Sequence, residues 1–104
     1  MIPSKTIEEL ILKHSTLEKD LSSGDIDKKL FAEKSKEYSD VNEIIDNAKK
    51  YISYDKDKKE LEKILEDNTA DQELKEMAEL ELSDLKSNFE VNEKKLKLFL
   101  LPKD

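Results

Sequence analysis

The residues best suited to catalysis or metal binding are one histidine and a large set of carboxylates. His14 precedes Glu18 by four positions, so on a helix the two side chains would share a face and could supply two metal ligands. A zinc or iron site needs three or four converging ligands, and the sequence has no second histidine and no cysteine. His14 also recurs with leucines and isoleucines at helical spacing. We therefore expect a packing histidine rather than a metal site.

The carboxylates are numerous, but their number alone does not make an active site. The 26 aspartates and glutamates include many pairs at helical spacing. Such a pair becomes a general acid and base only where a cavity shifts its pKa values, and a narrow helical assembly offers no deep cavity. The single glycine, Gly24, also excludes the glycine-rich loops that bind phosphates and dinucleotides. We expect no enzyme activity and no cofactor.

The charge balance indicates which partners the chain can have. Its formal net charge is −7, and all 19 basic residues are lysines. Nucleic-acid binders concentrate positive charge and use the planar arginine fork, so DNA is not an expected partner. The sequence has no cysteine, no apolar stretch near the roughly 20 residues of a membrane span, and no basic region followed by an apolar one at its start. These features predict a cytoplasmic protein without membrane contact.

Composition and apolar spacing predict an all-α fold. Alanine, glutamate, lysine and leucine account for 53 of the 104 residues, which is typical of long helices and coiled coils. The predicted helices cover residues 4–22, 26–67 and 71–101 of a single domain, residues 1–104. Thr6 and Glu9 have capping-box spacing near the first start, and Gly24 suits a left-handed residue after the first helix. Thr69 or Asp71 can cap the third helix.

The turn residues between the second and third predicted helices indicate a helical hairpin. The segment EDNTAD, residues 66–71, clusters turn and cap residues, and a short connection makes two long helices antiparallel neighbours. Facing residues should have numbers that sum to about 139 or 140, as Tyr51 and Phe89 do. Lys58 and Asn92 fall on this seam, where we expect structural roles. The predicted fold is a long antiparallel coiled-coil hairpin with a shorter N-terminal helix packed beside it.

Three stretches of the sequence, read in order, resemble a known family. They are SKEYSDV (residues 35–41), ELKEMAELEL (residues 73–82) and LFLLPKD (residues 98–104). The chain is similar over its entire length to the N-terminal helical domain of the bacterial peptide chain release factor 1 family, whose members read the stop codons UAA and UAG. The closing LLPKD is the most specific of the matching segments.

The resemblance implies a part in translation termination without chemistry of its own. The family's release chemistry resides in a Gly-Gly-Gln loop, and stop-codon reading resides in a separate tripeptide loop. Neither lies within this sequence, so the resemblance implies a fragment of a longer protein that has no release activity. It implies docking to the ribosome near the large-subunit stalk base, and to the release factor glutamine methyltransferase. It also implies a contact with the next domain at the C-terminal end, through Leu98, Phe99, Leu100 and Leu101.

A polar bend at the end of the hairpin is the candidate interaction surface. An acidic rod suits protein contacts better than tight binding to rRNA. The residues proposed for this surface are Asp67, Asn68, Thr69 and Ala70. A second hypothesis treats the chain as a free-standing acidic coiled-coil adaptor that dimerises through an exposed apolar stripe. Self-association of an isolated fragment through the exposed C-terminal leucines is left open by the sequence.

Overall fold

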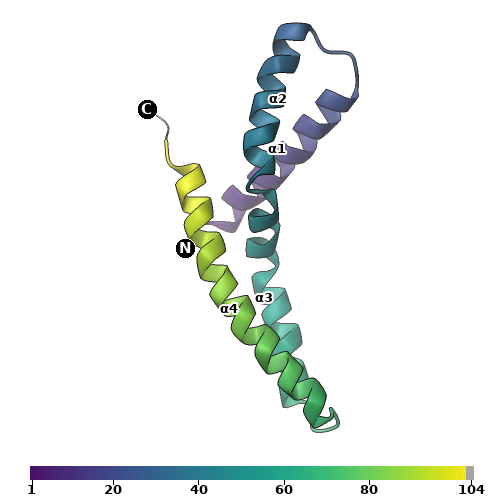
Figure 1. The fold of residues 1–104 in the computed structure, drawn as a ribbon, viewed down its shortest axis with the longest axis vertical. Helices are drawn as coiled ribbons and strands as arrows, with labels where there is room; N and C mark the ends of the chain where they lie inside the picture. Colours follow the sequence, from purple (N-terminus) through teal and green to yellow (C-terminus); the bar gives the residue numbers. More distant parts are fainter. Residues whose placement is uncertain (103–104) are drawn as a thin grey trace.

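The computed structural model describes residues 1–102, which form four helices and no strand. The helices are α1 (Ser4–Ser22), α2 (Lys28–Asn42), α3 (Ile45–Glu66) and α4 (Gln72–Leu100). Figure 1 shows two helical pairs joined end to end, with α1 beside α2 at one end and α3 beside α4 at the other. The predicted all-α class is confirmed.

The molecule is an elongated rod. Its extents are 60 × 31 × 20 Å and its radius of gyration is 18.3 Å, whereas a compact domain of this length has a radius of gyration of about 13 Å. The connection between α3 and α4 lies at one extremity of the rod (Figure 1). Within the described residues, no helix combines the length and apolar character that a membrane crossing needs.

The first helix ends where the sequence predicted, but it does not begin with a capping box. Gly24 has a φ of 72°, the left-handed conformation that glycine adopts without steric cost. At the other end, α1 starts at Ser4, and no side chain caps it. The carbonyl of Pro3 accepts a bond from the Thr6 N–H at 3.1 Å. Thr6 therefore lies inside the first turn, where it cannot act as the cap.

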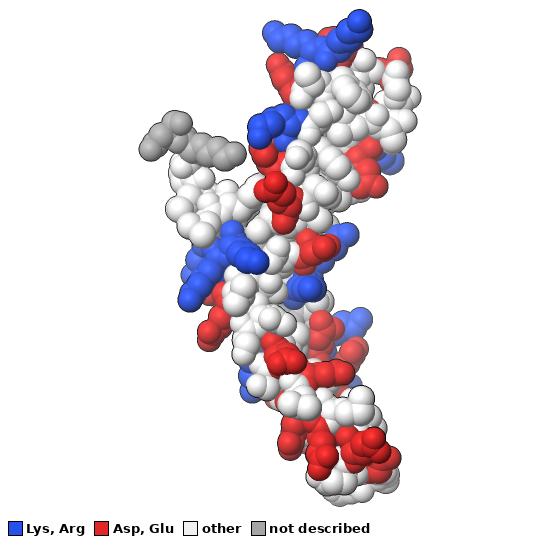
Figure 2. Space-filling view, in the orientation of Figure 1, with Lys and Arg blue, Asp and Glu red and all other residues white. Residues whose placement is uncertain are grey.

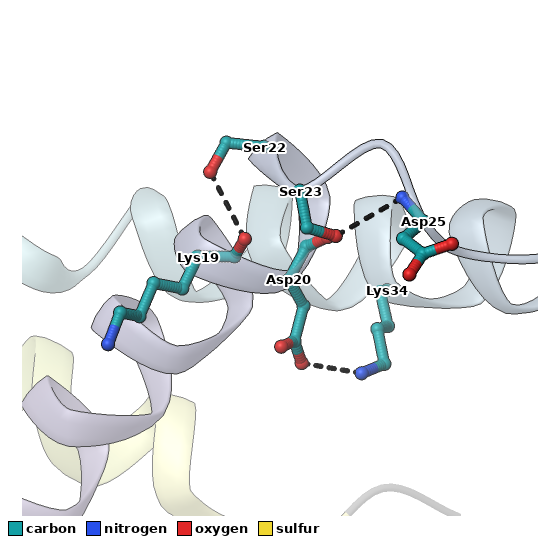
Figure 3. A network of polar contacts seen from close by, with 6 residues as sticks. All are labelled: Lys19, Asp20, Ser22, Ser23, Asp25 and Lys34. Carbon is teal, nitrogen blue, oxygen red and sulfur yellow. Dashed lines mark hydrogen bonds and ion pairs between the residues drawn. The ribbon is translucent and has the colours of Figure 1, made fainter.

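Polar contacts fix the connection from α1 to α2 (Figure 3). The Ser22 hydroxyl donates to the Lys19 carbonyl oxygen at 3.1 Å, which also accepts from the Ser23 N–H, and the Ser23 hydroxyl donates to the Asp20 carbonyl oxygen at 2.8 Å. The Asp20 carboxylate also pairs with the Lys34 ammonium of α2. The serine bonds close the end of α1, and the Asp20–Lys34 ion pair joins that end to the middle of α2.

The single helix predicted over residues 26–67 is wrong, because this segment forms two helices. The break lies at Glu43 and Ile44, where the Ile44 N–H bonds to the carbonyl of Val41, three residues back, at 3.0 Å. A long helix was expected because no glycine or proline interrupts the segment. Their absence permits a straight helix without enforcing one. Burial of Val41 and Ile44 on either side of the tightened turn offsets the interrupted backbone ladder.

The break changes which helices form the hairpin. We predicted that residues 26–67 would pair with the last helix, but only α3 packs along α4, and α2 packs on α1. Within this shorter hairpin the predicted register is confirmed. The rings of Tyr51 and Phe89 stack with centroids 4.9 Å apart, and the Asn47 amide donates to Asn92 Oδ1 at 2.9 Å.

The buried core lies at the junction of the two helical pairs rather than along the hairpin. Ile7 of α1 and Leu96 of α4 are both 0% exposed. The cluster comprises Ile2, Ile7, Leu10, Leu17, Val41, Ile44, Ala48, Tyr51 and Leu96. Beyond it, the outer arm of the hairpin, residues 52–88, has one fully buried residue among those described, Ala78. The outer arm therefore projects from the core.

We expect truncation of Leu96 to destabilise the chain strongly. Leu96→Ala should lower the free energy of unfolding by about 2–5 kcal/mol, because it leaves a cavity where both helical pairs meet. Leu98→Ala, on the same helix but 69% exposed, should change it by no more than about 0.5 kcal/mol. Urea denaturation followed by circular dichroism measures both values. Equal losses in the two variants would contradict the assigned core.

Candidate functional site

The predicted interaction surface is an ordered turn at the far end of the outer arm. We call residues 67–71 the tip turn. The Thr69 N–H and the Thr69 hydroxyl both donate to Asp67 Oδ1, at 2.8 and 2.6 Å. Asn68 is exposed, and Ala70 is partly exposed. Asp71 then caps α4, accepting from the Leu74 N–H at 2.8 Å. The surface is therefore a shaped projection and not a loose loop.

The same hydrogen bonds set the acidity of the tip turn. The Thr69 hydroxyl, followed by the Thr69 N–H, holds the pKa of the Asp67 carboxyl below its usual value, because both donors bind the charged form. Lys75 lowers this pKa further. The tip turn therefore stays anionic at every physiological pH, and its charge is available to a partner.

The predicted contact with a further domain lies at the other end of α4. Leu98 and Leu101 are 69% and 60% exposed, and Leu100 is also exposed. Phe99, in contrast, is partly buried against the core cluster. Because α4 has 29 residues, its two ends are about 43 Å apart. The two predicted surfaces are therefore separate sites.

His14 lies in a polar cluster between α1 and α2. Its side chain is buried, and Nε2 donates to Asn42 Oδ1 at 2.9 Å. The imidazole stacks on the Tyr38 ring with centroids 4.9 Å apart, and Nδ1 is 3.9 Å from Glu18 Oε2. Within residues 1–102, no three histidine, cysteine or acidic side chains converge as metal ligands do. The arrangement supports the interpretation of His14 as a packing histidine.

A second polar contact ties the start of the chain to the hairpin. The Ile2 N–H donates to the Tyr51 hydroxyl oxygen at 3.0 Å. The same hydroxyl is the donor to Glu93 Oε2 of α4 at 3.2 Å and to the Ile2 carbonyl oxygen at 3.4 Å. Burial raises the pKa of the Tyr51 phenol, and the nearby Glu93 carboxylate adds to the rise. One hydroxyl therefore connects the N-terminal residues, α3 and α4.

Acidic side chains gather on the outer arm. Residues 60–84 contain ten acidic residues and two lysines, and Figure 2 shows acidic side chains clustered over the end of the molecule where α3 meets α4. Lysines cover part of α4 nearer its C-terminal end in the same view. This polarity follows the helix dipole of α4, whose N-terminus favours negative charge.

A groove between α3 and α4 was not identified from the sequence. It measures about 530 Å³ and is lined by Asp57, Glu60, Leu61, Ile64, Glu81, Asp84, Leu85 and Asn88. We call it the carboxylate groove. The register rule could have found it, because Asp57 with Asp84 and Glu60 with Glu81 each have numbers that sum to 141, close to the predicted 139 or 140. Lys58, expected on the seam, is half-buried on α3 and forms no ion pair among the described residues.

Comparison with known proteins identifies the family of this chain. The PCRF domain model matches residues 10–104, which is most of the chain. The chain belongs to the PCRF domain family. It is 72% identical to peptide chain release factor 1 of Pelagibacter ubique over 104 residues, which is 100% of this chain and 29% of that protein. The PCRF domain is a release factor domain and not an enzyme.

More distant relatives agree with this assignment. Peptide chain release factor 1 of Lachnoclostridium phytofermentans is 37% identical over 94% of this chain and 28% of its own length. The Orientia tsutsugamushi (strain Boryong) protein of that name is 36% identical over 94% of this chain and 27% of its own length. The chain thus spans less than a third of these relatives. No solved structure matches it. The resemblance to release factor 1 is confirmed.

The tip turn should respond to the loss of one hydroxyl. Thr69→Val should raise the pKa of Asp67 toward the ordinary aspartate range, because the main donor to the carboxylate is removed. In the parent chain the charged Asp67 carboxylate stabilises the folded turn at pH values above the ordinary aspartate pKa. This stabilisation is lost as the pH falls through the lowered pKa of Asp67. Titration of the Asp67 side-chain carbon by NMR measures the shift. Thr16→Val on α1 should leave it unchanged, and an unchanged pKa in Thr69→Val would refute the assigned contact.

The hydroxyl of Tyr51 should contribute measurably to stability. Tyr51→Phe should lower the free energy of unfolding by about 1–3 kcal/mol, because the buried Ile2 N–H loses its acceptor. Tyr54→Phe removes the same atom from the same helix, but the Tyr54 hydroxyl makes no hydrogen bond among the described residues. Tyr54→Phe should lower the free energy of unfolding by less than about 0.5 kcal/mol. Urea unfolding at neutral pH measures both variants, and equal losses of free energy would exclude the proposed role of the Tyr51 hydroxyl.

Proposed function

We propose that this chain is the N-terminal docking domain of a release factor that terminates translation at UAA and UAG codons in the cytoplasm. The observation that carries the proposal is the similarity of the whole chain to peptide chain release factor 1 proteins of several bacteria. The chain spans about 29% of the first of these relatives. The Gly-Gly-Gln loop that the resemblance associates with release chemistry is not among these residues, so we assign no release activity to this chain.

The shape of the molecule supports a docking role. The outer arm projects from the core and ends in the ordered, anionic tip turn. A rigid projection loses little conformational freedom when a partner binds, which favours affinity. We assign the tip turn to contacts with the ribosome near the large-subunit stalk base and with the release factor glutamine methyltransferase. Negative charge there favours a protein surface over the rRNA backbone.

The opposite end of α4 supports a contact with the rest of a longer protein. Leu98, Leu100 and Leu101 are exposed around the C-terminal end of α4, while Phe99 packs against the core. Exposed apolar residues that adjoin one another mark interaction surfaces. We assign this turn to a neighbouring domain, and in the isolated chain the same leucines would favour self-association.

The docking role is tested by binding and release assays on the same chain. Calorimetry should detect binding of purified release factor glutamine methyltransferase, and Asn68→Lys at the tip turn should weaken it about tenfold, or about 1.4 kcal/mol. Asn68 is exposed and makes no side-chain hydrogen bond among the described residues, so this change leaves the turn intact. Thr16→Lys adds the same charge on α1 and should change affinity less than about twofold.

The chain itself should release no peptide from ribosomes stalled at a UAA codon. Release by the chain alone would refute its assignment as a docking domain. Equal loss of affinity in Asn68→Lys and Thr16→Lys would show that the tip turn is not the contact surface.

A further inference from the structure

The carboxylate groove has the features of a binding site for a positively charged side chain. Its floor is apolar and consists of Leu61, Ile64 and Leu85, which remain partly accessible between the two helices. Carboxylates stand on both sides of this floor, Asp57 and Glu60 on α3 and Glu81 and Asp84 on α4. Asn88 is the one uncharged polar residue of the lining, and none of the eight lining residues is basic.

Among the described residues, these carboxylates have no ion-pair partner. Among residues 1–102, the five ion pairs all involve other acidic residues. Asp57 accepts a hydrogen bond from the Ser53 hydroxyl at 2.9 Å, which does not neutralise it. Asp57 is partly buried and Glu60, Glu81 and Asp84 are exposed, so the four carboxylates repel one another through solvent, and the acidic residues of the tip add to the same field. A bound cation would relieve that repulsion.

The geometry favours two basic side chains held one helical turn apart. Asp57 and Glu60 are three residues apart on α3, as are Glu81 and Asp84 on α4, so the rim has two cross-groove carboxylate pairs. A lysine or arginine can lay its aliphatic stem on the leucine floor while its head lies between carboxylates. Basic residues at i and i+4 of a partner helix have the matching spacing, with apolar neighbours filling the floor.

We propose that the carboxylate groove binds a basic amphipathic helical segment of a protein partner. The inference deepens the docking role and rests on it, because it names the chemistry of one partner surface. A metal ion is a poorer occupant, since the carboxylates are spread along the groove and do not converge among the described residues. RNA is repelled by the same charges. A second copy of the chain has a net charge of −7 and meets the same repulsion.

NMR titration of the ¹⁵N-labelled chain with a synthetic peptide tests the groove. The probe is an 18-residue helical peptide of leucine and lysine with lysines at i and i+4, and its control replaces every lysine by glutamate. The lysine peptide should shift the amide signals of Leu61, Ile64, Leu85 and Asn88 at low salt. Binding should weaken at least tenfold between about 0.02 and 0.5 M salt, because the contacts are partly exposed. The glutamate peptide should not bind.

Matched variants separate the groove from general acidity. The double variant Glu60→Gln/Glu81→Gln should weaken binding at least fivefold, because it removes one cross-groove pair. Glu8→Gln/Glu33→Gln changes the net charge equally at exposed positions of α1 and α2, and it should weaken binding less than twofold. All four glutamates are exposed, and circular dichroism should show the same helix content in both variants.

Three results would overturn the proposal: equal weakening in the two double variants, peptide shifts outside the groove, or equal shifts with a single-stranded RNA. Failure of the groove is distinguishable from failure of the docking role. Methyltransferase binding that responds to Asn68→Lys but not to Glu60→Gln/Glu81→Gln would retain the tip turn as a docking surface and reject the groove. Methyltransferase binding that does not respond to Asn68→Lys, together with intact binding of the lysine peptide, would retain the groove and reject the tip turn as a docking surface.

Discussion

The structure depends on the first turns of α3, which pack against both α1 and α4. Ala48 is fully buried there, and its small side chain lets neighbouring helices approach closely. Ile44 and Tyr51 lie in the same cluster as Ile7 of α1 and Leu96 of α4. Within the described residues, α4 packs along α3, and neither α1 nor α2 packs along α4. The two helical pairs are therefore held together by the packing of α1 along α3 and by this cluster, with Tyr51 adding the hydrogen bonds to Ile2 and Glu93.

This placement of the core explains why the surfaces suited to binding lie elsewhere. Side chains that stabilise the junction are buried, whereas the outer arm has a seam of partly exposed leucines and a high density of carboxylates. Local stability should therefore decrease from the junction toward the tip turn, where hydrogen bonds from Thr69 to Asp67 replace hydrophobic burial. A domain built in this way can present a charged arm without exposing the core that holds it.

The features readable from sequence were those with a local physical cause. Gly24 and Asp71 indicated helix ends because left-handed backbone and side-chain capping depend on one or two residues. The pairing of Tyr51 with Phe89 followed from a short turn and helical periodicity.

The break at Ile44 had no local signal, since it arises from packing against α1 on one side and α4 on the other. The bonds from His14 to Asn42 and from Ile2 to Tyr51 likewise join residues whose proximity depends on the tertiary fold. The carboxylate groove is an intermediate case, because the predicted register brought residues 57–60 of α3 close to Glu81 and Asp84 but assigned Lys58 to the seam opposite them.

That register is itself secured by a polar pair in the seam. Apolar seams tolerate helical slippage, whereas the Asn47 amide meets the buried Asn92 in only one alignment of α3 and α4. A slip of one turn would leave the Asn92 side chain without its partner, at a cost of about 1–3 kcal/mol. The same slip would move Glu81 and Asp84 away from Glu60 and Asp57. An uncharged amide pair near the core thus determines which carboxylates face one another about ten residues, or about 15 Å, along the outer arm. Specificity in the seam and charge on the surface are consequently set by one alignment.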